Sequence, residues 1–85
     1  MKMTREEFVE WFSSNTMFSK DGMFSDYSWK YESNYEPLMY EYISIDETTV
    51  EYRWEELYWG GSDWKERLFT FEEFIEAYKN DAIKF

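Results

Sequence analysis

The chain has 85 residues, of which 19 are Asp or Glu and nine are Lys or Arg, so its formal net charge is −10 at pH 7. It contains neither His nor Cys, and 25% of its residues are aromatic. These totals exclude a disulfide scaffold and a His-dependent catalytic triad, and they disfavour direct binding to nucleic acid or to anionic membranes, both of which attract Lys and Arg.

The length predicts one domain over residues 1–85 with a small core that depends on its aromatic side chains. No apolar run approaches the roughly 20 residues of a membrane span, and the first residues lack the apolar segment of a signal peptide. We therefore expect a cytoplasmic protein.

The first predicted element is a helix over residues 4–14. Thr4 is a candidate N-cap, and Glu7 stands three residues later as in a capping box. Phe8, Trp11 and Phe12 then recur at helical spacing. Residues 15–26 are rich in Ser, Asn, Asp and Gly, which predicts an ordered loop.

Four strands are predicted next, over residues 27–32, 38–45, 49–57 and 64–69. The third has the clearest period of two, because Val50, Tyr52 and Trp54 alternate with charged residues. Turns are expected at residues 34–37, 46–48 and 60–63.

A second helix is predicted over residues 70–80, where Thr70 and Glu73 form another capping box before an apolar stripe. Short connections favour an antiparallel meander. The predicted fold class is therefore α+β: a small antiparallel sheet of three or four strands flanked by an N-terminal and a C-terminal helix, in the order α-β-β-β-β-α.

Acidic residues are concentrated in the central hairpin. Residues 32–56 include eight acids and one base, Arg53, and so carry seven of the ten net negative charges. Residues two apart on a strand point the same way, roughly 6.6 Å apart. Glu51 and Glu55 are expected on one face, with Glu41 on the neighbouring strand. Such an array could bind a groove built for nucleic acid, although an ordinary solvated face is an equally good interpretation.

Aromatic residues provide a second signal, because one small core cannot enclose all of them. Tyr40 and Tyr42 share one face of the second predicted strand, and Tyr58 and Trp59 precede the turn at Gly60. Packing in the core is the plain explanation for any single ring. We expect Tyr58 and Trp59 to be exposed at the rim of an interface.

Catalytic and metal sites are not predicted. Asp21, Gly22 and Asp26 lack the alternating acids and the closing Glu of a calcium loop, and no Gly-rich phosphate-binding loop is present. We expect no enzyme activity, no metal and no cofactor.

In size, charge and aromatic content the chain resembles the small acidic proteins with which phages and mobile elements block host nucleic-acid enzymes. These include DNA-mimic inhibitors of restriction enzymes, DNA glycosylases and CRISPR nucleases. No motif carries this resemblance, so it assigns no functional residues. It implies an inhibitor, of the anti-CRISPR or anti-restriction type, that occupies the basic groove of a nucleic-acid-binding enzyme.

Two alternatives stay open: an adaptor or immunity-type protein that binds through an aromatic patch, and a homodimer formed through an edge strand. The predicted partner-binding residues are Glu41, Asp46, Glu47, Glu51, Glu55, Glu56, Tyr58 and Trp59.

Overall fold

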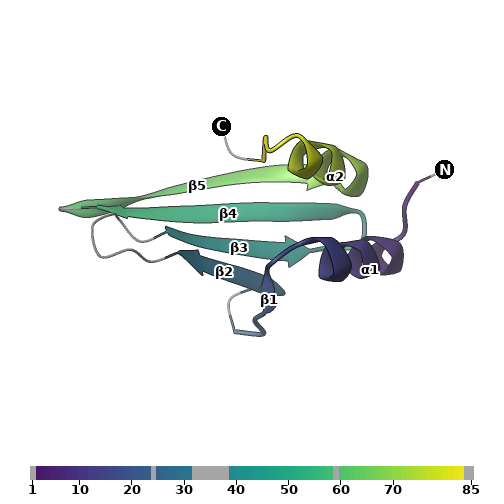
Figure 1. The fold of residues 1–85 in the computed structure, drawn as a ribbon, viewed down its shortest axis with the longest axis horizontal. Coiled ribbons are helices and arrows are strands. Elements are labelled where there is room, and N and C mark those ends of the chain that lie inside the picture. Colours follow the sequence, from purple (N-terminus) through teal and green to yellow (C-terminus); the bar gives the residue numbers. More distant parts are fainter. Residues whose placement is uncertain (1, 24, 32–38, 59, 84–85) are drawn as a thin grey trace.

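The computed structural model describes residues 2–23, 25–31, 39–58 and 60–83, and shows two helices and a five-stranded sheet (Figure 1). The predicted α+β class is confirmed. The elements are, in chain order, α1 (Arg5–Asn15), β1 (Ser19–Lys20), β2 (Tyr27–Tyr31), β3 (Met39–Ile45), β4 (Thr49–Tyr58), β5 (Gly61–Thr70) and α2 (Phe71–Lys79).

The sheet has one strand more than predicted. Ser19 and Lys20, in the segment expected to be a loop, pair with Ser28 and Tyr27 of β2. A two-residue strand has too little sequence to show a period of two, which is why the pattern did not reveal it. The strand order β1-β2-β3-β4-β5 and the antiparallel pairing of all neighbours confirm the predicted meander.

Both helices begin at the predicted capping boxes. The Thr4 hydroxyl accepts a hydrogen bond from the backbone N–H of Glu7 at 3.1 Å, and the Glu7 carboxylate accepts one from the N–H of Thr4 at 2.9 Å. Thr70 and Glu73 repeat this exchange at 3.2 and 2.9 Å. These hydrogen bonds satisfy N–H groups that have no partner within the helix.

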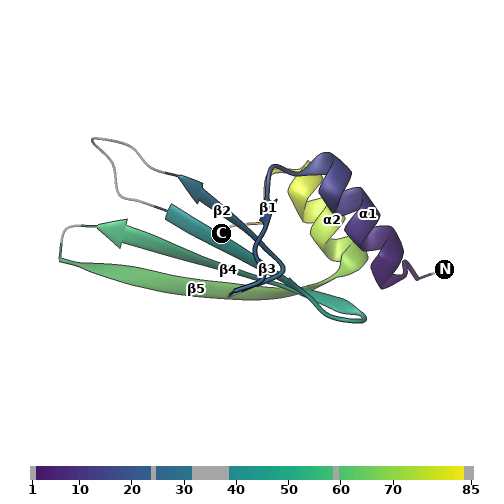
Figure 2. The ribbon, with the colours of Figure 1, turned by 90° about the horizontal axis from the view of Figure 1, so that it is seen from below.

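The core lies between one face of the sheet and the two helices. Phe8 of α1 stacks on Phe71 of α2 with ring centroids 4.7 Å apart, so the helices pack side by side (Figure 2). The buried residues that fill this layer are Phe8, Phe12, Tyr27, Ile43, Ile45, Val50, Tyr52, Trp54, Phe69, Phe71 and Phe74.

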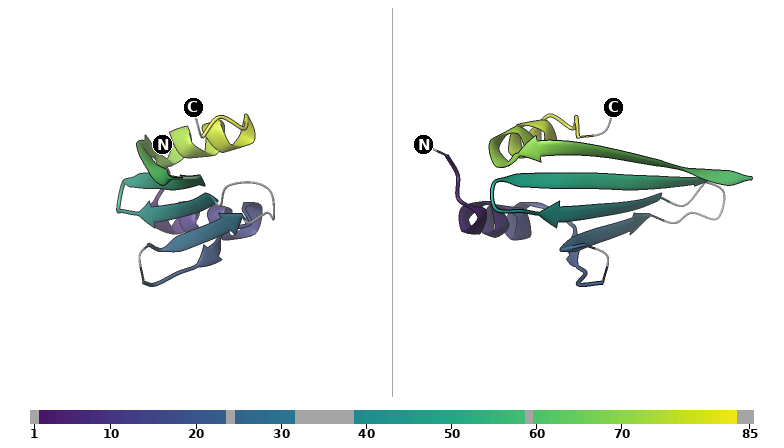
Figure 3. Two further views of the ribbon diagram at one scale, coloured as in Figure 1. Left: turned by 90° about the vertical axis from the view of Figure 1, so that its left-hand side faces the viewer. Right: turned by 180° about the vertical axis from the view of Figure 1, so that it is seen from behind.

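We call the sheet face beneath the helices the helix face and the opposite one the open face, because no described helix lies on it (Figures 2 and 3). The molecule is elongated, 46 × 25 × 18 Å, and both helices sit toward one end. The paired ends of β4 and β5 near Gly60 project beyond them (Figure 3). One face and one end of the sheet are therefore left uncovered by the described helices.

Candidate binding surface

Strand β4 places Glu51, Arg53 and Glu55 on the open face, as predicted. Val50, Tyr52 and Trp54 alternate with them and are buried on the helix face. The Arg53 Nε atom lies 3.1 Å from a carboxylate oxygen of Glu51, so the only base of the acidic segment forms an ion pair inside it. The charge presented here is smaller than the sequence count predicts.

Glu41 lies on the neighbouring strand, as predicted, but it does not join Glu51 and Glu55 in one array, because it lies on the other face of the sheet. Glu41 pairs across the strands with Trp54, and cross-strand partners point to the same face, so Glu41 lies on the helix face. Its side chain is only 6% exposed and accepts a hydrogen bond from the Tyr52 hydroxyl. The side-chain period of two fixes the face once the register is set, and sequence spacing does not give that register.

The remaining predicted acids lie in two other places. Glu56 pairs with Met39 and Asp63, which puts it on the helix face near the projecting end of the sheet. Asp46 and Glu47 are exposed in the β3–β4 turn, at the opposite end of the strand. The acids of the central hairpin that the structure describes therefore do not form one continuous array.

The two predicted aromatic anchors are not tested. Tyr58 is the last residue of β4, but its side chain lies outside the described part of the chain, and Trp59 lies outside the described residues altogether.

The open face carries other exposed apolar side chains that the sequence reasoning missed. Trp64 is 57% exposed and Leu68 is 67% exposed. The Trp64 ring stacks on Tyr42 with centroids 5.8 Å apart and an interplanar angle of 23°. Burial, followed by the nearby charge of Glu55, raises the pKa of the Tyr42 hydroxyl, so Tyr42 stays neutral at ordinary pH.

Sequence reasoning missed Trp64 and Leu68 because the order of apolar and charged residues along β5 does not show which face is buried. Its helix-face positions include the charged Lys65 and Arg67, while Trp64 and Leu68 occupy the open face. A pattern that assigns apolar residues to the core would place Trp64 and Leu68 inside. The clear alternation of β4 could have revealed them. Once β5 is paired with β4, Trp64 and Leu68 lie opposite Glu55 and Glu51 and therefore on the open face.

A third glutamate completes the surface. Glu66 of β5 pairs directly with Arg53, and it is diagonal to both Glu51 and Glu55. Diagonal neighbours of this kind are roughly 7–8 Å apart. We call the set the aromatic–acidic surface; it comprises Tyr42, Glu51, Arg53, Glu55, Trp64, Glu66 and Leu68.

The side chains of this surface offer apolar contact and ion pairing to another molecule. It combines the exposed ring of Trp64, the half-buried ring of Tyr42, an exposed leucine and three carboxylates around one guanidinium. Among the residues that the structure describes, no group of three or more side chains of the metal-binding types is close enough to hold an ion. None of the described helices has the length and apolar character that crossing a membrane requires.

Comparisons of the chain with protein-family models, curated proteins and solved structures gave no match.

Proposed function

We propose that this protein is a non-enzymatic acidic binding protein that docks its aromatic–acidic surface onto a basic surface of another protein. The observation that carries the proposal is the stacked pair of Tyr42 and exposed Trp64, which lies among Glu51, Glu55 and Glu66 on a face without a described helix. Protein interfaces favour an aromatic centre with a charged rim.

The charge of the chain selects the class of partner. A net charge of −10 attracts basic surfaces over long range and repels phosphate backbones. Carboxylates on neighbouring strands are spaced on a scale similar to phosphates and can bind the same Lys and Arg side chains. The partner that fits best is a nucleic-acid-binding enzyme in the cytoplasm, whose groove the protein would cover as a stoichiometric inhibitor of the anti-restriction or anti-CRISPR type.

The structure changes which residues we assign to the interface. Glu51 and Glu55 stay in it, and Glu66, Trp64, Tyr42 and Leu68 join it. Glu41 and Glu56 leave it because both lie on the helix face. Asp46 and Glu47 belong to a separate exposed turn at the other end of the strand.

A second candidate function, an adaptor or immunity-type partner, is favoured by one observation. The ion pair between Arg53 and Glu51 reduces the local charge, whereas Trp64 and Leu68 remain more than half exposed. An interface governed by these apolar groups would respond weakly to salt, whereas an interface governed by carboxylates is screened.

The test begins with capture of partners from lysates at low salt and a binding titration with the captured protein. For an inhibitor we expect the nucleic acid of the partner to compete, and affinity to fall by about tenfold or more between about 50 and 200 mM salt. Salt-insensitive binding that nucleic acid does not displace would instead support the adaptor.

Amide replacements test the surface itself. Reversing the charges of Glu51 and Glu55 would crowd cations around Arg53, so Glu51→Gln with Glu55→Gln is the cleaner change. This variant and Trp64→Ala should each weaken partner binding by about tenfold or more. The control is Glu10→Gln with Glu76→Gln, which changes net charge equally on exposed helix positions. Equal binding by test and control variants would reject this surface as the interface.

A further inference from the structure

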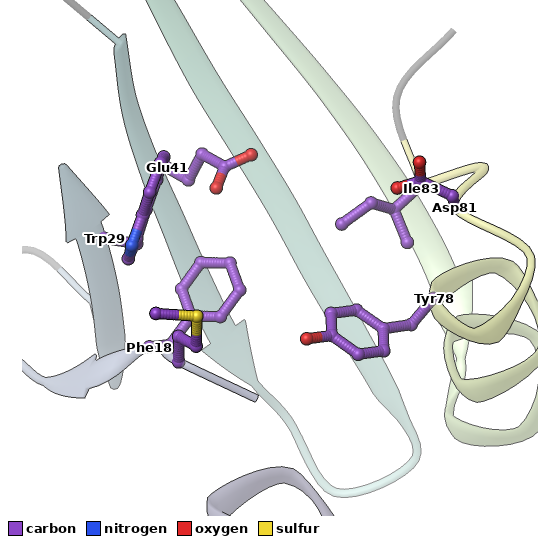
Figure 4. Close-up of a pocket in the computed structure, with 7 residues that line it drawn as sticks. Phe18, Trp29, Glu41, Tyr78, Asp81 and Ile83 are labelled. Atoms are coloured by element: carbon purple, nitrogen blue, oxygen red, sulfur yellow. The ribbon is translucent and has the colours of Figure 1, made fainter. Parts of the chain in front are cut away.

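A cavity of about 580 Å³ opens on the helix face, on the side of the sheet opposite the aromatic–acidic surface (Figure 4). Trp29 and Glu41, which pair across β2 and β3, contribute from the sheet. Phe18 and Met17 approach from the segment after α1, and Tyr78, Asp81 and Ile83 from α2 and the residues after it. Its volume is in the range of small-molecule sites, about 300–1,000 Å³.

Packing holds the aromatic walls in place. Phe18 packs on the buried Phe12 with centroids 5.4 Å apart, and Tyr78 meets Trp11 edge-on at 5.8 Å. The segment that carries Ile83 is fixed by Arg67, whose guanidinium donates hydrogen bonds to the carbonyls of Ala82 and Ile83 at 3.0 and 3.1 Å. The cavity is therefore a preformed one, and its rings need little reordering to accept a ligand.

The lining of the cavity includes a buried carboxyl group. Glu41 lies on the sheet between the aromatic walls and is almost completely buried, with the Tyr52 hydroxyl donating to it. Burial, and then the hydrogen bond to Glu41, raises the pKa of Tyr52, so Tyr52 remains a neutral donor and adds no charge. Asp81 supplies a second, exposed carboxylate to the lining.

The lining contains three aromatic rings and two carboxylates, and no Lys or Arg is among the described lining residues. This composition favours a positively charged ligand. Ring faces attract cations, and most strongly so where water is excluded. A buried carboxylate is stabilised by an opposite charge and disfavours an anion. Phosphates, carboxylic acids and other anions are therefore excluded as ligands.

We infer that this cavity binds a small organic cation, an ammonium group on a short apolar stem. The ammonium head would lie between the rings of Trp29, Phe18 and Tyr78 and near the carboxyl of Glu41, with the stem along Met17 and Ile83. Because the site is on the helix face, the inference is independent of the function proposed for the open face.

Choline and its neutral isostere 3,3-dimethylbutan-1-ol provide the direct test, because they share shape and differ in charge. Each is titrated into the ¹⁵N-labelled protein and followed by NMR. We expect choline to bind at least about fivefold more tightly, with shifts at the Trp29 indole and near Glu41 and Tyr78. Equal binding of the two, or shifts only elsewhere, would overturn the inference.

A second arm distinguishes a free quaternary ammonium ion from a lysine side chain carried by a protein. N-acetyl-lysine methylamide represents the lysine side chain, and choline represents the free ion. The probe that binds more tightly identifies the source of the cation. The comparison of choline with its neutral isostere alone decides whether the inference stands.

The variant Glu41→Gln keeps the shape of the side chain and removes its charge. We expect it to lose about fivefold or more of the affinity for choline, whereas Glu6→Gln, which makes the same change at an exposed position of α1, should bind as the parent does. Undiminished choline binding by Glu41→Gln would contradict the role of its charge. The isostere comparison uses the parent protein, so it stands even if that variant fails to fold.

Discussion

At the scale of single residues, the pair of Tyr52 and Glu41 is the least expected feature of the core. Both side chains are buried on the helix face, and the Tyr52 hydroxyl donates to the Glu41 carboxyl. Burying an acid among aromatic rings is costly unless hydrogen bonds compensate. The two residues should therefore behave as a unit in folding.

Replacing Tyr52 with Phe removes this donor and leaves the carboxyl buried. We expect a loss of about 1–3 kcal/mol in the free energy of unfolding, measured by urea titration. In a double-mutant cycle with Glu41→Leu, much of this cost should disappear, because both polar groups are then gone. Additive single costs would show that the hydrogen bond does not couple the two residues.

At the scale of elements, the helices depend on their capping boxes. Hydrogen bonds from Thr4 and Thr70 lower the pKa of Glu7 and Glu73 below the ordinary value of 4.5. The unfolded chain therefore binds protons at these carboxyls more readily than the folded chain. Their stabilising contribution is present above pH 4.5 and is lost as the pH falls through the lowered values.

Substitution of both glutamates by Gln should flatten this dependence. Between neutral pH and about pH 3, we expect the thermal midpoint of the parent to fall more than that of Glu7→Gln with Glu73→Gln. Circular dichroism melts at several pH values measure the difference, with Glu6→Gln and Glu10→Gln as the control. Parallel curves for parent and test variant would contradict the role of the caps.

The elements also show what the sequence could and could not predict. Both helix starts and the two faces of β4 followed from local rules, because a capping box and a period of two are properties of neighbouring residues. Glu51 and Glu55 were placed correctly for that reason. The faces of Glu41 and Trp64 depend on pairing with β4, which is a long-range property, and the two-residue strand β1 exists only through its partner.

At the scale of the whole molecule, the excess of ten negative charges acts against the compact state. Acids project from the exposed faces of both helices, from the β3–β4 turn and from the open face. Some of the repulsion is offset locally by the ion pairs of Arg5 with Asp26 and of Arg53 with Glu51. Most of the repulsion between the acids is screened only by water and dissolved ions.

Added salt should therefore stabilise the protein. We expect the thermal midpoint to rise between about 10 and 150 mM NaCl, because the screening length shortens to about 8 Å over this range. The rise should be smaller for a variant with Gln at four exposed acids, namely Glu6, Glu10, Glu72 and Glu76. A midpoint that falls with salt would mean that attractive ion pairs dominate.

The one-sided placement of the helices has a consequence for how the sheet fluctuates. Near Gly60 the ends of β4 and β5 are paired with each other but lie beyond the helix layer, whereas their other ends are anchored by Val50 and Phe69 in the core. Amide hydrogens should then exchange with solvent in a gradient along the hairpin, fastest toward Gly60, because the described residues there, 60–63, are exposed and lie beyond the helix layer. A partner seated on Trp64 and Leu68 would slow this exchange, which offers a way to map its footprint without knowing its identity.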